Sequence, residues 1–293
     1  MPKHVIVIGS SGKIGGLFAR TLAGTGATLT GIDVVEPPLT THLDTFLMTD
    51  ITAPSADAAH VLARAEWVFV CLPEESALRA LPFVTESLPP GALWVDTLSV
   101  KQQVCDALMY IARVESVSIN PLFAPDLGFS NQNVAVVQAS PPGPRATAFM
   151  QWLETVGARI VTLSAAAHDR YSATTQVATH ALLLAFGMLL EAADYDVGVA
   201  LKVSTPPHRL LLSLLHRVTS GDPDLYWSIQ QSHSLGPDVR QSLIHAITAL
   251  DRMVAAGDAG TFVSTFERLR ARLAAAGQAL EPITRAALEA VSR

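Results

Sequence analysis

The chain is poor in charged residues, aromatic residues and cysteine. Its two cysteines, Cys71 and Cys105, cannot build a disulfide framework, and we expect a reducing compartment such as the cytoplasm. Only 16% of the residues are charged and 49% are apolar, which excludes a disordered chain and favours a compact protein. The net charge of −6 gives no reason to expect nucleic acid or an anionic membrane as a partner.

Long hydrophobic runs are also missing. The longest, Ala181 to Leu190, is too short for a membrane span and is flanked by His180 and Glu191. A strand pattern begins almost at Met1 and leaves no room for a signal peptide. We therefore expect a soluble cytoplasmic protein, and 293 residues suffice for two domains.

The first half of the chain alternates β-branched runs with helical patterns. This alternation predicts an α/β domain, a Rossmann-type doubly wound parallel sheet with crossover helices. The expected strands are His4–Ile8, Ala27–Asp33, Trp67–Leu72, Ala92–Thr97, Ser116–Asn120, Asn133–Gln138 and Arg159–Leu163, with a helix at Lys13–Ala23.

Strand patterns end at residue 164, where Ser164 is a plausible helix N-cap. The expected helices are Ala165–Asp194, His208–Thr219, Pro223–Ser232, Pro237–Ala255, Thr261–Ala275 and Glu281–Ser292. We therefore predict two domains, an α/β domain over residues 1–164 and an all-helical domain over residues 165–293.

A glycine-rich turn follows the first strand and predicts a dinucleotide site. Glycines in this pattern let the backbone approach a pyrophosphate and let the helix pack on the strand, while the helix N-terminus favours the anion. Ser10 takes the place of the first glycine of the common Gly-x-Gly-x-x-Gly pattern. The expected cofactor-binding residues in the turn are Gly9, Ser10, Ser11, Gly12, Lys13, Ile14 and Gly15.

Asp33 ends the second strand and specifies the cofactor. A carboxylate there accepts hydrogen bonds from the adenine-ribose hydroxyls and repels a 2′-phosphate, which favours NAD over NADP. We add Leu72, Pro73 and Ser99 to the cofactor site because they lie at or just past the ends of strands, at the carboxyl edge of the sheet.

Asp96 to Lys101 and Asn120 to Asp126 begin at the ends of two further expected strands, at the edge where such sheets bind ligands. We expect Asp96 to hold its loop in place. Ser99 is a candidate for the active site, with an ordinary turn serine as the alternative. Lys101 is either a substrate ligand or a solvated cation at a helix start.

A polar stripe marks the first long helix of the second half, where His168, Ser172, Gln176 and His180 recur every four residues. Buried polar groups without partners cost about 1–3 kcal/mol each, so this stripe needs partners, and we expect a cleft between the two domains to provide them. Gln176 and His180 are candidate substrate-binding residues, although a core or interface histidine is possible. His168 is expected to serve mainly at the helix start.

Arg209 lies in the first turn of a helix that Pro206 and Pro207 begin. A cation there opposes the helix dipole, so a structural reason is weak, whereas a guanidinium fork suits a carboxylate. We expect Arg209 to bind a substrate carboxylate, with a surface ion pair as the alternative. No histidine, cysteine or carboxylate spacing predicts a metal site.

These motifs together resemble the prephenate dehydrogenase family, from Val5 to about Leu273. The family reads Asp-x-x-Ser-Val-Lys, as at Asp96 to Lys101, and His-Pro-Met-Phe-Gly-Pro-Asp, which aligns with Asn120 to Asp126. The resemblance implies NAD-dependent oxidative decarboxylation of a cyclohexadiene dicarboxylate by a homodimer whose helical domain mediates dimerisation. It also implies that Ser99 lies beside the nicotinamide, that His180 contacts the substrate and that Arg209 binds its carboxylate.

Asn120 departs from the family, because it stands where the catalytic histidine is expected and cannot accept a proton. A substrate with an amino group at C4 needs no such base, since its nitrogen lone pair stabilises the developing cation. We therefore expect Asn120 and Ser99 to be the catalytic residues of a 4-amino-4-deoxyprephenate dehydrogenase that serves natural-product (antibiotic) biosynthesis. The alternatives are prephenate or arogenate dehydrogenase in aromatic amino acid biosynthesis, a catalytically inert NAD-binding protein, and another Rossmann reductase.

Overall fold

A computed structural model describes residues 1–53 and 55–292. The chain divides into two compact units, Met1–Ser172 and Ala173–Arg293. Sequence patterns place the domain boundary at residue 164, eight residues before this division. Ser164 does cap the helix that follows, since its Oγ accepts the Ala167 N–H at 3.2 Å.

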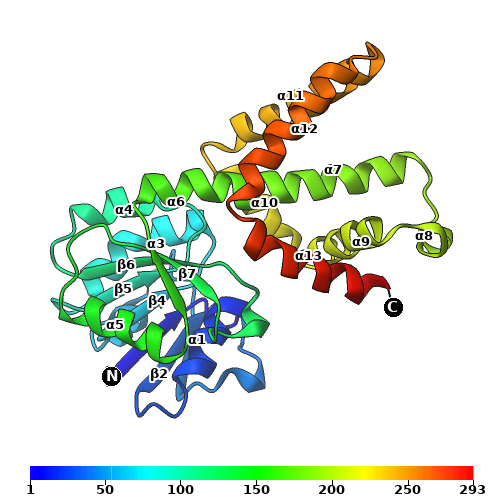
Figure 1. Cartoon of the computed structure of the whole chain (residues 1–293). Coiled ribbons are helices and arrows are strands. Elements are labelled where there is room, and N and C mark those ends of the chain that lie inside the picture. Colours follow the sequence, from blue (N-terminus) through cyan, green and yellow to red (C-terminus); the bar gives the residue numbers. More distant parts are fainter. Residues whose placement is uncertain (54, 293) are drawn as a thin grey trace. The chain divides into compact units, whose positions relative to one another are not determined.

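The first unit contains an eight-stranded sheet in the order β3-β2-β1-β4-β5-β6-β7-β8 (Figure 1). All neighbouring strands are parallel except β6 and β7, whose antiparallel pairing differs from the fully parallel sheet that we expected. The strands are β1 (His4–Ile8), β2 (Thr28–Asp33), β3 (Thr45–Met48), β4 (Trp67–Val70), β5 (Leu93–Asp96), β6 (Glu115–Pro121), β7 (Asn133–Val137) and β8 (Arg159–Thr162).

Helices cover both faces of this sheet, so successive side chains of a strand enter different cores. In β1, Val5 and Val7 join the cluster that contains Phe18, while Ile6 and Ile8 join the opposite cluster. The helices of this unit are α1 (Lys13–Leu22), α2 (Ala56–Leu62), α3 (Glu74–Ser87), α4 (Gln102–Met109), α5 (Pro144–Thr155) and α6 (Ala165–Ser172), with 3₁₀ turns at Leu39–Thr41 and Pro125–Leu127. The architecture confirms the predicted Rossmann-type domain.

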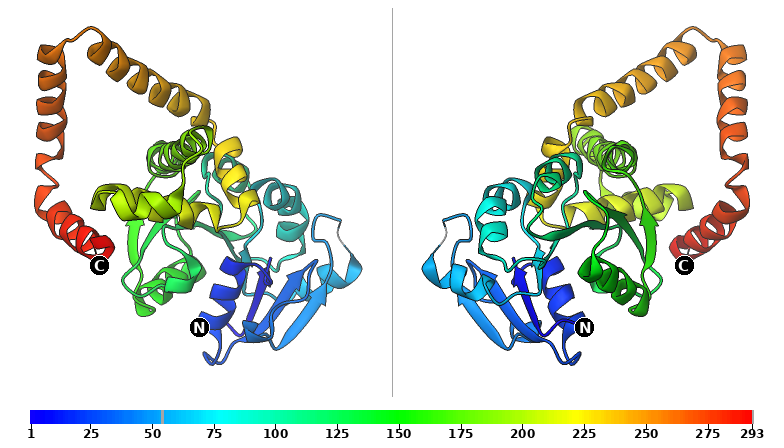
Figure 2. Two further views of the ribbon diagram at one scale, coloured as in Figure 1. Left: turned by 90° about the vertical axis from the view of Figure 1, so that its right-hand side faces the viewer. Right: turned by 90° about the vertical axis from the view of Figure 1, so that its left-hand side faces the viewer.

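The second unit is helical throughout its described residues, as predicted. It comprises a π-helical segment (Ala173–Ala178) and helices α7 (Thr179–Ala192), α8 (Val197–Val203), α9 (Pro206–Thr219), α10 (Pro223–Ser232), α11 (Gly236–Ala255), α12 (Ala259–Ala274) and α13 (Gly277–Ser292). Helix α9 packs against α7 and α13, and α11 packs against the π-helical segment. The far ends of α11 and α12 project away from α7 and α9 (Figure 2). The short helix α8 and the π-helical segment were not expected from the sequence.

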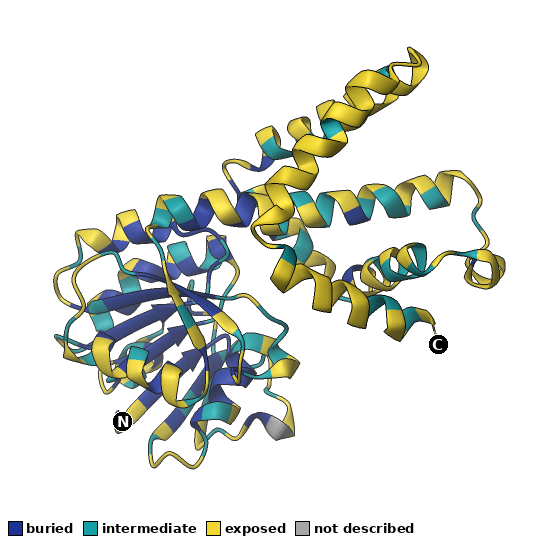
Figure 3. Cartoon of the chain, in the orientation of Figure 1, coloured by how far each residue is buried: buried dark blue, intermediate teal, exposed yellow. Residues whose placement is uncertain are grey.

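Burial differs strongly between the two units (Figure 3). The strands of the first unit are mostly buried, whereas α11 and α12 expose apolar side chains at helical spacing. These are Ile244, Ile247, Leu250 and Val254 on α11, and Phe262, Phe266, Leu269 and Leu273 on α12. One helical segment, Ala165–Ala192, is also long and apolar enough to span a membrane by length and composition, a test that core helices of soluble proteins pass as well.

Candidate active site

The glycine-rich turn after β1 forms a cradle in which side chains would not fit. Gly9 has φ +78°, and a Cβ there would collide with the Cys71 carbonyl. A Cβ on Gly15 would collide with the Gly9 carbonyl. Gly12 precedes α1, and no side chain caps this helix. Its first N–H groups are therefore available to a pyrophosphate.

The Asp33 carboxylate lies beside this cradle. One oxygen accepts the Ser11 N–H at 2.9 Å and the other accepts the Val34 N–H at 2.7 Å, which fixes the carboxylate at the end of β2. It lines a cavity of about 550 Å³. The predicted cofactor residues in its wall are Gly9, Ser11, Gly12, Asp33, Leu72 and Pro73. The wall also includes Arg79 of α3, which we did not single out in the sequence.

The other predicted cofactor residues support the turn or lie elsewhere. Ser10 is fully buried, and its Oγ has no hydrogen-bond partner among the described residues. Lys13 and Ile14 open α1. Ser99 follows β5 and is half-buried. None of these four residues belongs to the cavity wall.

A buried polar network lies beneath the ends of β5 and β6. Asp96 accepts hydrogen bonds from Ser118 Oγ at 2.6 Å, Trp94 Nε1 at 3.1 Å and the Leu98 N–H at 3.4 Å. These bonds tie the loop after β5 to the neighbouring strand. They support the expectation that Asp96 holds the loop.

Lys101 belongs to the same network and is fully buried. Its Nζ donates to the Ile119 carbonyl at 2.6 Å and forms an ion pair with Asp96 at 3.4 Å. Burial lowers the pKa of this ammonium, while Asp96 acts in the opposite direction. The side chain therefore binds the backbone of Ile119, the residue before Asn120. A fully buried lysine is not a solvated cation, and its ammonium is not exposed to a ligand.

Asn120 lies near the end of β6, with 4% of its surface exposed. Its Nδ2 is 3.1 Å from His168 Nε2, and His168 Nδ1 is 2.9 Å from Asp169 Oδ1. His168 and Asp169 come from α6, and both are buried. Asn120, His168 and Asp169 therefore form a linked series within the first unit.

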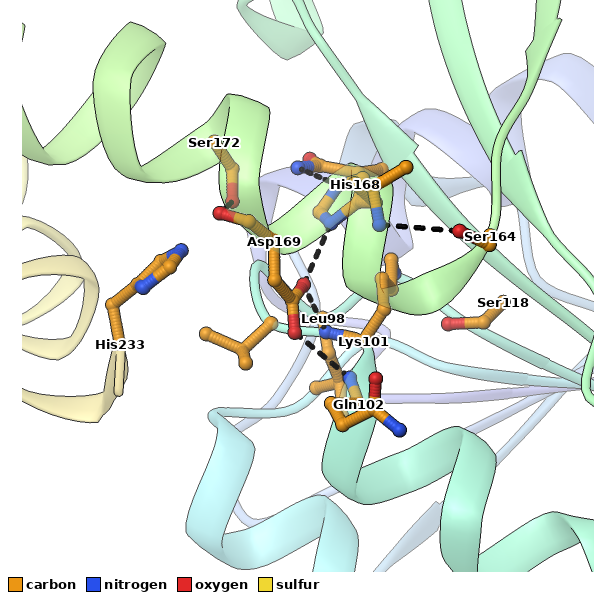
Figure 4. A network of polar contacts seen from close by, with 12 residues as sticks. Leu98, Lys101, Gln102, Ser118, Ser164, His168, Asp169, Ser172 and His233 are labelled. Atoms are coloured by element: carbon orange, nitrogen blue, oxygen red, sulfur yellow. Dashed lines mark hydrogen bonds and ion pairs between the residues drawn. The ribbon is translucent and has the colours of Figure 1, made fainter. Parts of the chain in front are cut away.

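Asp169 also caps the start of α4. Its two oxygens accept the backbone N–H groups of Lys101 at 2.8 Å and Gln102 at 2.9 Å. Figure 4 shows this carboxylate between the His168 ring and the residues that begin α4. Burial alone would raise the pKa of Asp169, but the bonds from His168, Lys101 and Gln102 lower it. The carboxylate is thus held in its ionised form.

Glu74, at the start of α3, is a further buried carboxyl group in this unit. Its Oε1 accepts the Val100 N–H at 2.7 Å. Burial raises the pKa of Glu74 to about 7, although the Val100 N–H and Lys101 act against this shift. Glu74 was not recognised in the sequence because its burial follows from the fold.

The second unit holds Gln176 and His180, four residues apart. Gln176 Oε1 and His180 Nδ1 are enclosed polar atoms without a partner among the described residues. Burial, with a smaller contribution from Arg217, lowers the pKa of His180, so the imidazole tends to be neutral. Its ring packs edge-on against Tyr226, with centroids 4.9 Å apart. A ligand that forms hydrogen bonds with Gln176 Oε1 and His180 Nδ1 would satisfy both atoms.

Arg209 is half-buried in the first turn of α9. Its Nε donates to Ser204 Oγ at 3.2 Å and its Nη1 donates to the Val291 carbonyl at 3.2 Å. These bonds orient the guanidinium without pairing it with a carboxylate in the described chain. Charge-assisted donors therefore remain for an anionic ligand.

Comparison with known proteins identifies the family. The chain is 35% identical to a 4-amino-4-deoxyprephenate dehydrogenase of Streptomyces pristinaespiralis, across 94% of this chain and 93% of the relative. The chain belongs to the prephenate dehydrogenase family. Residues 164–268 match the family model described as "Prephenate dehydrogenase, dimerization domain".

Other relatives match at lower identity. A T-protein of Enterobacter agglomerans is 27% identical across 91% of this chain, which spans 66% of that protein's length. The fold resembles that of Aquifex aeolicus prephenate dehydrogenase, solved with hydroxyphenyl propionate and NAD+. The TM-score is 0.70 at 15% identity, over 92% of this chain and 96% of the solved one. Membership confirms the resemblance predicted from the motifs and makes this protein a dehydrogenase.

Proposed function

We propose that this protein catalyses the NAD-dependent oxidative decarboxylation of 4-amino-4-deoxyprephenate to 4-aminophenylpyruvate. The observation that carries the proposal is the amide of Asn120 at the end of β6, where the family motif has a histidine. The relative that is 35% identical is named for the same substrate. Its source, a Streptomyces species, fits a role in making an antibiotic precursor.

NAD supplies the hydride acceptor of this reaction. The glycine cradle, the uncapped start of α1 and the Asp33 carboxylate suit its pyrophosphate and adenine ribose. Asp33 places a negative charge where a 2′-phosphate would otherwise bind. The site therefore favours NAD over NADP.

Asn120 suits an amino group at the reacting carbon C4. Hydride leaves C4 while carbon dioxide leaves C1, and the ring becomes aromatic. A C4 hydroxyl needs a base that takes or polarises its proton, and an amide cannot accept that proton. The nitrogen of the free amine donates its lone pair to the developing cation without losing a proton, so for a substrate bound as the free amine an amide oxygen that orients the N–H is sufficient.

Arg209, His180 and Gln176 are the proposed substrate-binding residues. The Arg209 guanidinium is oriented by Ser204 and Val291 and offers a fork to a carboxylate. The unpaired atoms of Gln176 and His180 offer further polar contacts. Ser99 is proposed to lie beside the nicotinamide. Lys101 contributes indirectly, by holding the Ile119 carbonyl next to Asn120.

We further propose a cytoplasmic homodimer formed through the helical unit. The region matched by the dimerisation-domain model includes α11 and most of α12. Both helices expose apolar stripes to water, and contact with a second copy of the chain would bury them.

The test measures NADH formation from 4-amino-4-deoxyprephenate, prephenate and arogenate with the same enzyme preparation. We expect the highest kcat/KM with the amino compound. A preference for prephenate or arogenate would contradict the substrate assignment and support the second candidate function, a prephenate or arogenate dehydrogenase. NAD binding without turnover of any of the three compounds would indicate an inert binding protein.

A further inference from the structure

The Asn120 side chain has two chemically different ends, an NH₂ donor and an oxygen acceptor, and its surroundings decide which end a ligand meets. Its Nδ2 is 3.1 Å from His168 Nε2. No described residue donates a hydrogen bond to Oδ1, and protein atoms do not fully enclose this oxygen. It therefore remains open to a ligand.

Asp169 determines where His168 carries its proton. The Asp169 carboxylate already accepts two backbone N–H groups at the start of α4, which favour its ionised form. An ionised carboxylate cannot donate, so His168 Nδ1, 2.9 Å away, must carry the hydrogen of that contact. In a neutral imidazole, Nε2 is then an acceptor.

An acceptor at His168 Nε2 selects one orientation of the Asn120 amide. The NH₂ group must face His168, because turning the amide over would bring an oxygen lone pair against a nitrogen lone pair. The oxygen then faces the ligand. The orientation thus follows from the chain of contacts through Asp169 and does not depend on distinguishing oxygen from nitrogen in Asn120 itself.

We propose that Asp169 and His168 are positioning residues that set substrate specificity by presenting the Asn120 oxygen to the C4 substituent. This inference rests on the proposed function. An oxygen accepts an N–H of a C4 amino group and leaves the nitrogen lone pair free to stabilise the cation. The reversed amide would donate to that lone pair and withdraw it from the reaction.

The first test determines the His168 tautomer in the full-length protein with NAD bound. Histidine labelled with ¹⁵N distinguishes the nitrogen that carries a proton, and the His168→Asn variant assigns the signal by its disappearance. We expect the Nδ1–H tautomer. The Nε2–H tautomer, or an imidazolium with hydrogen on both nitrogens, would overturn the proposal, since Asn120 would then have to turn its oxygen toward His168.

The second test uses two variants that separate the contacts of His168. His168→Asn retains a short donor for Asp169 but cannot reach Asn120, whereas His168→Gln places an amide oxygen near the former Nε2. We expect kcat with the amino compound to fall about 10- to 100-fold in the Asn variant, with NAD affinity unchanged. The Gln variant should recover most of the activity.

His60→Asn, on the exposed surface of α2, is the matched control for the loss of a helical histidine and should leave kcat unchanged. Equal losses in the Asn and Gln variants, accompanied by equal falls in NAD affinity and Tm, would assign His168 to packing and overturn the proposal. The tautomer measurement needs no substrate. Its failure is therefore distinguishable from an error in the proposed reaction.

Discussion

Replacing Asn120 with histidine should create activity toward prephenate. The substitution restores a base at the end of β6, where the family motif has one. His168 Nε2, 3.1 Å from the present amide nitrogen, can accept an N–H from the new ring and leave the other ring nitrogen as the proton acceptor. Ser99 is a second group that could orient it.

The size of this gain follows from the chemistry of a general base. Such a base contributes about 10²–10⁴-fold, equivalent to roughly 3–5 kcal/mol of barrier. The larger ring enters a site that is only 4% exposed, and overpacking costs about 1–3 kcal/mol. The difference between the middle values is about 2 kcal/mol, so we expect kcat/KM for prephenate to rise about 30-fold, while that for the amino compound stays level or falls.

The assay records NADH formation from both substrates as a function of pH. Activity of the variant on prephenate should increase as pH rises through the imidazole range, about 6.5 for an unperturbed histidine. Asn120→Gln is the matched control, because it adds bulk without a base and should gain no prephenate activity. A folded, NAD-binding Asn120→His variant with no gain on prephenate would refute the reasoning, as would an unaltered protein that prefers prephenate.

Three further predictions concern the cofactor site, the substrate site and stability. Asp33→Ser should reduce the preference for NAD over NADP in kcat/KM, and equal turnover with both cofactors by the unaltered protein would contradict the role of Asp33. Arg209→Ala should raise KM at a cost of about 2–4 kcal/mol with NAD affinity unchanged, and Arg209→Lys should restore only part of the loss. A normal KM with a lower Tm would make Arg209 structural. Because burial raises the pKa of Glu74 from 4.5 to about 7, the apoprotein should lose stability as pH rises through this interval, by up to about 3 kcal/mol. The Glu74→Gln side chain still accepts the Val100 N–H but does not titrate, so this variant should not lose stability between pH 5 and pH 8. Denaturant titrations at the two pH values measure the free energy of unfolding, and an equal change in both proteins would refute the assignment to Glu74.

The sequence predicts most of the fold because burial repeats with the period of each element. The central strands are continuous apolar runs between turn residues, and each lies within two residues of its expected position. β3 was missed because it is short and has no buried residue. The antiparallel direction of β7 could not be predicted from the sequence. Val134 to Val137 are buried on both faces of the sheet, as the residues of a parallel strand usually are.

The candidate site was only partly predictable. The glycine turn, Asp33 and Asn120 are local signals, since the turn follows a recognisable strand and the other two lie at strand ends. The importance of His168 depends on a contact with a residue 48 positions away, which no local pattern reveals. Two signals were available in the sequence: the polar stripe that includes His168, and the acidic residue directly after it, because a buried His-Asp pair needs partners. Lys101 was misjudged for the same reason, since its charge suggested exposure and its burial depends on β6.

The charged residues beneath Asn120 are difficult to explain by stability alone. Burying Lys101 and Asp96 costs several kcal/mol per ion, and well-packed apolar residues often stabilise such a position equally well. Hydrogen bonds are directional and can fix the orientation of a polar group, which apolar packing cannot do. Lys101 fixes the Ile119 carbonyl, while Asp169 joins α6 to the start of α4 and fixes the proton of His168. Both converge on one amide, which supports the conclusion that this network serves to orient Asn120.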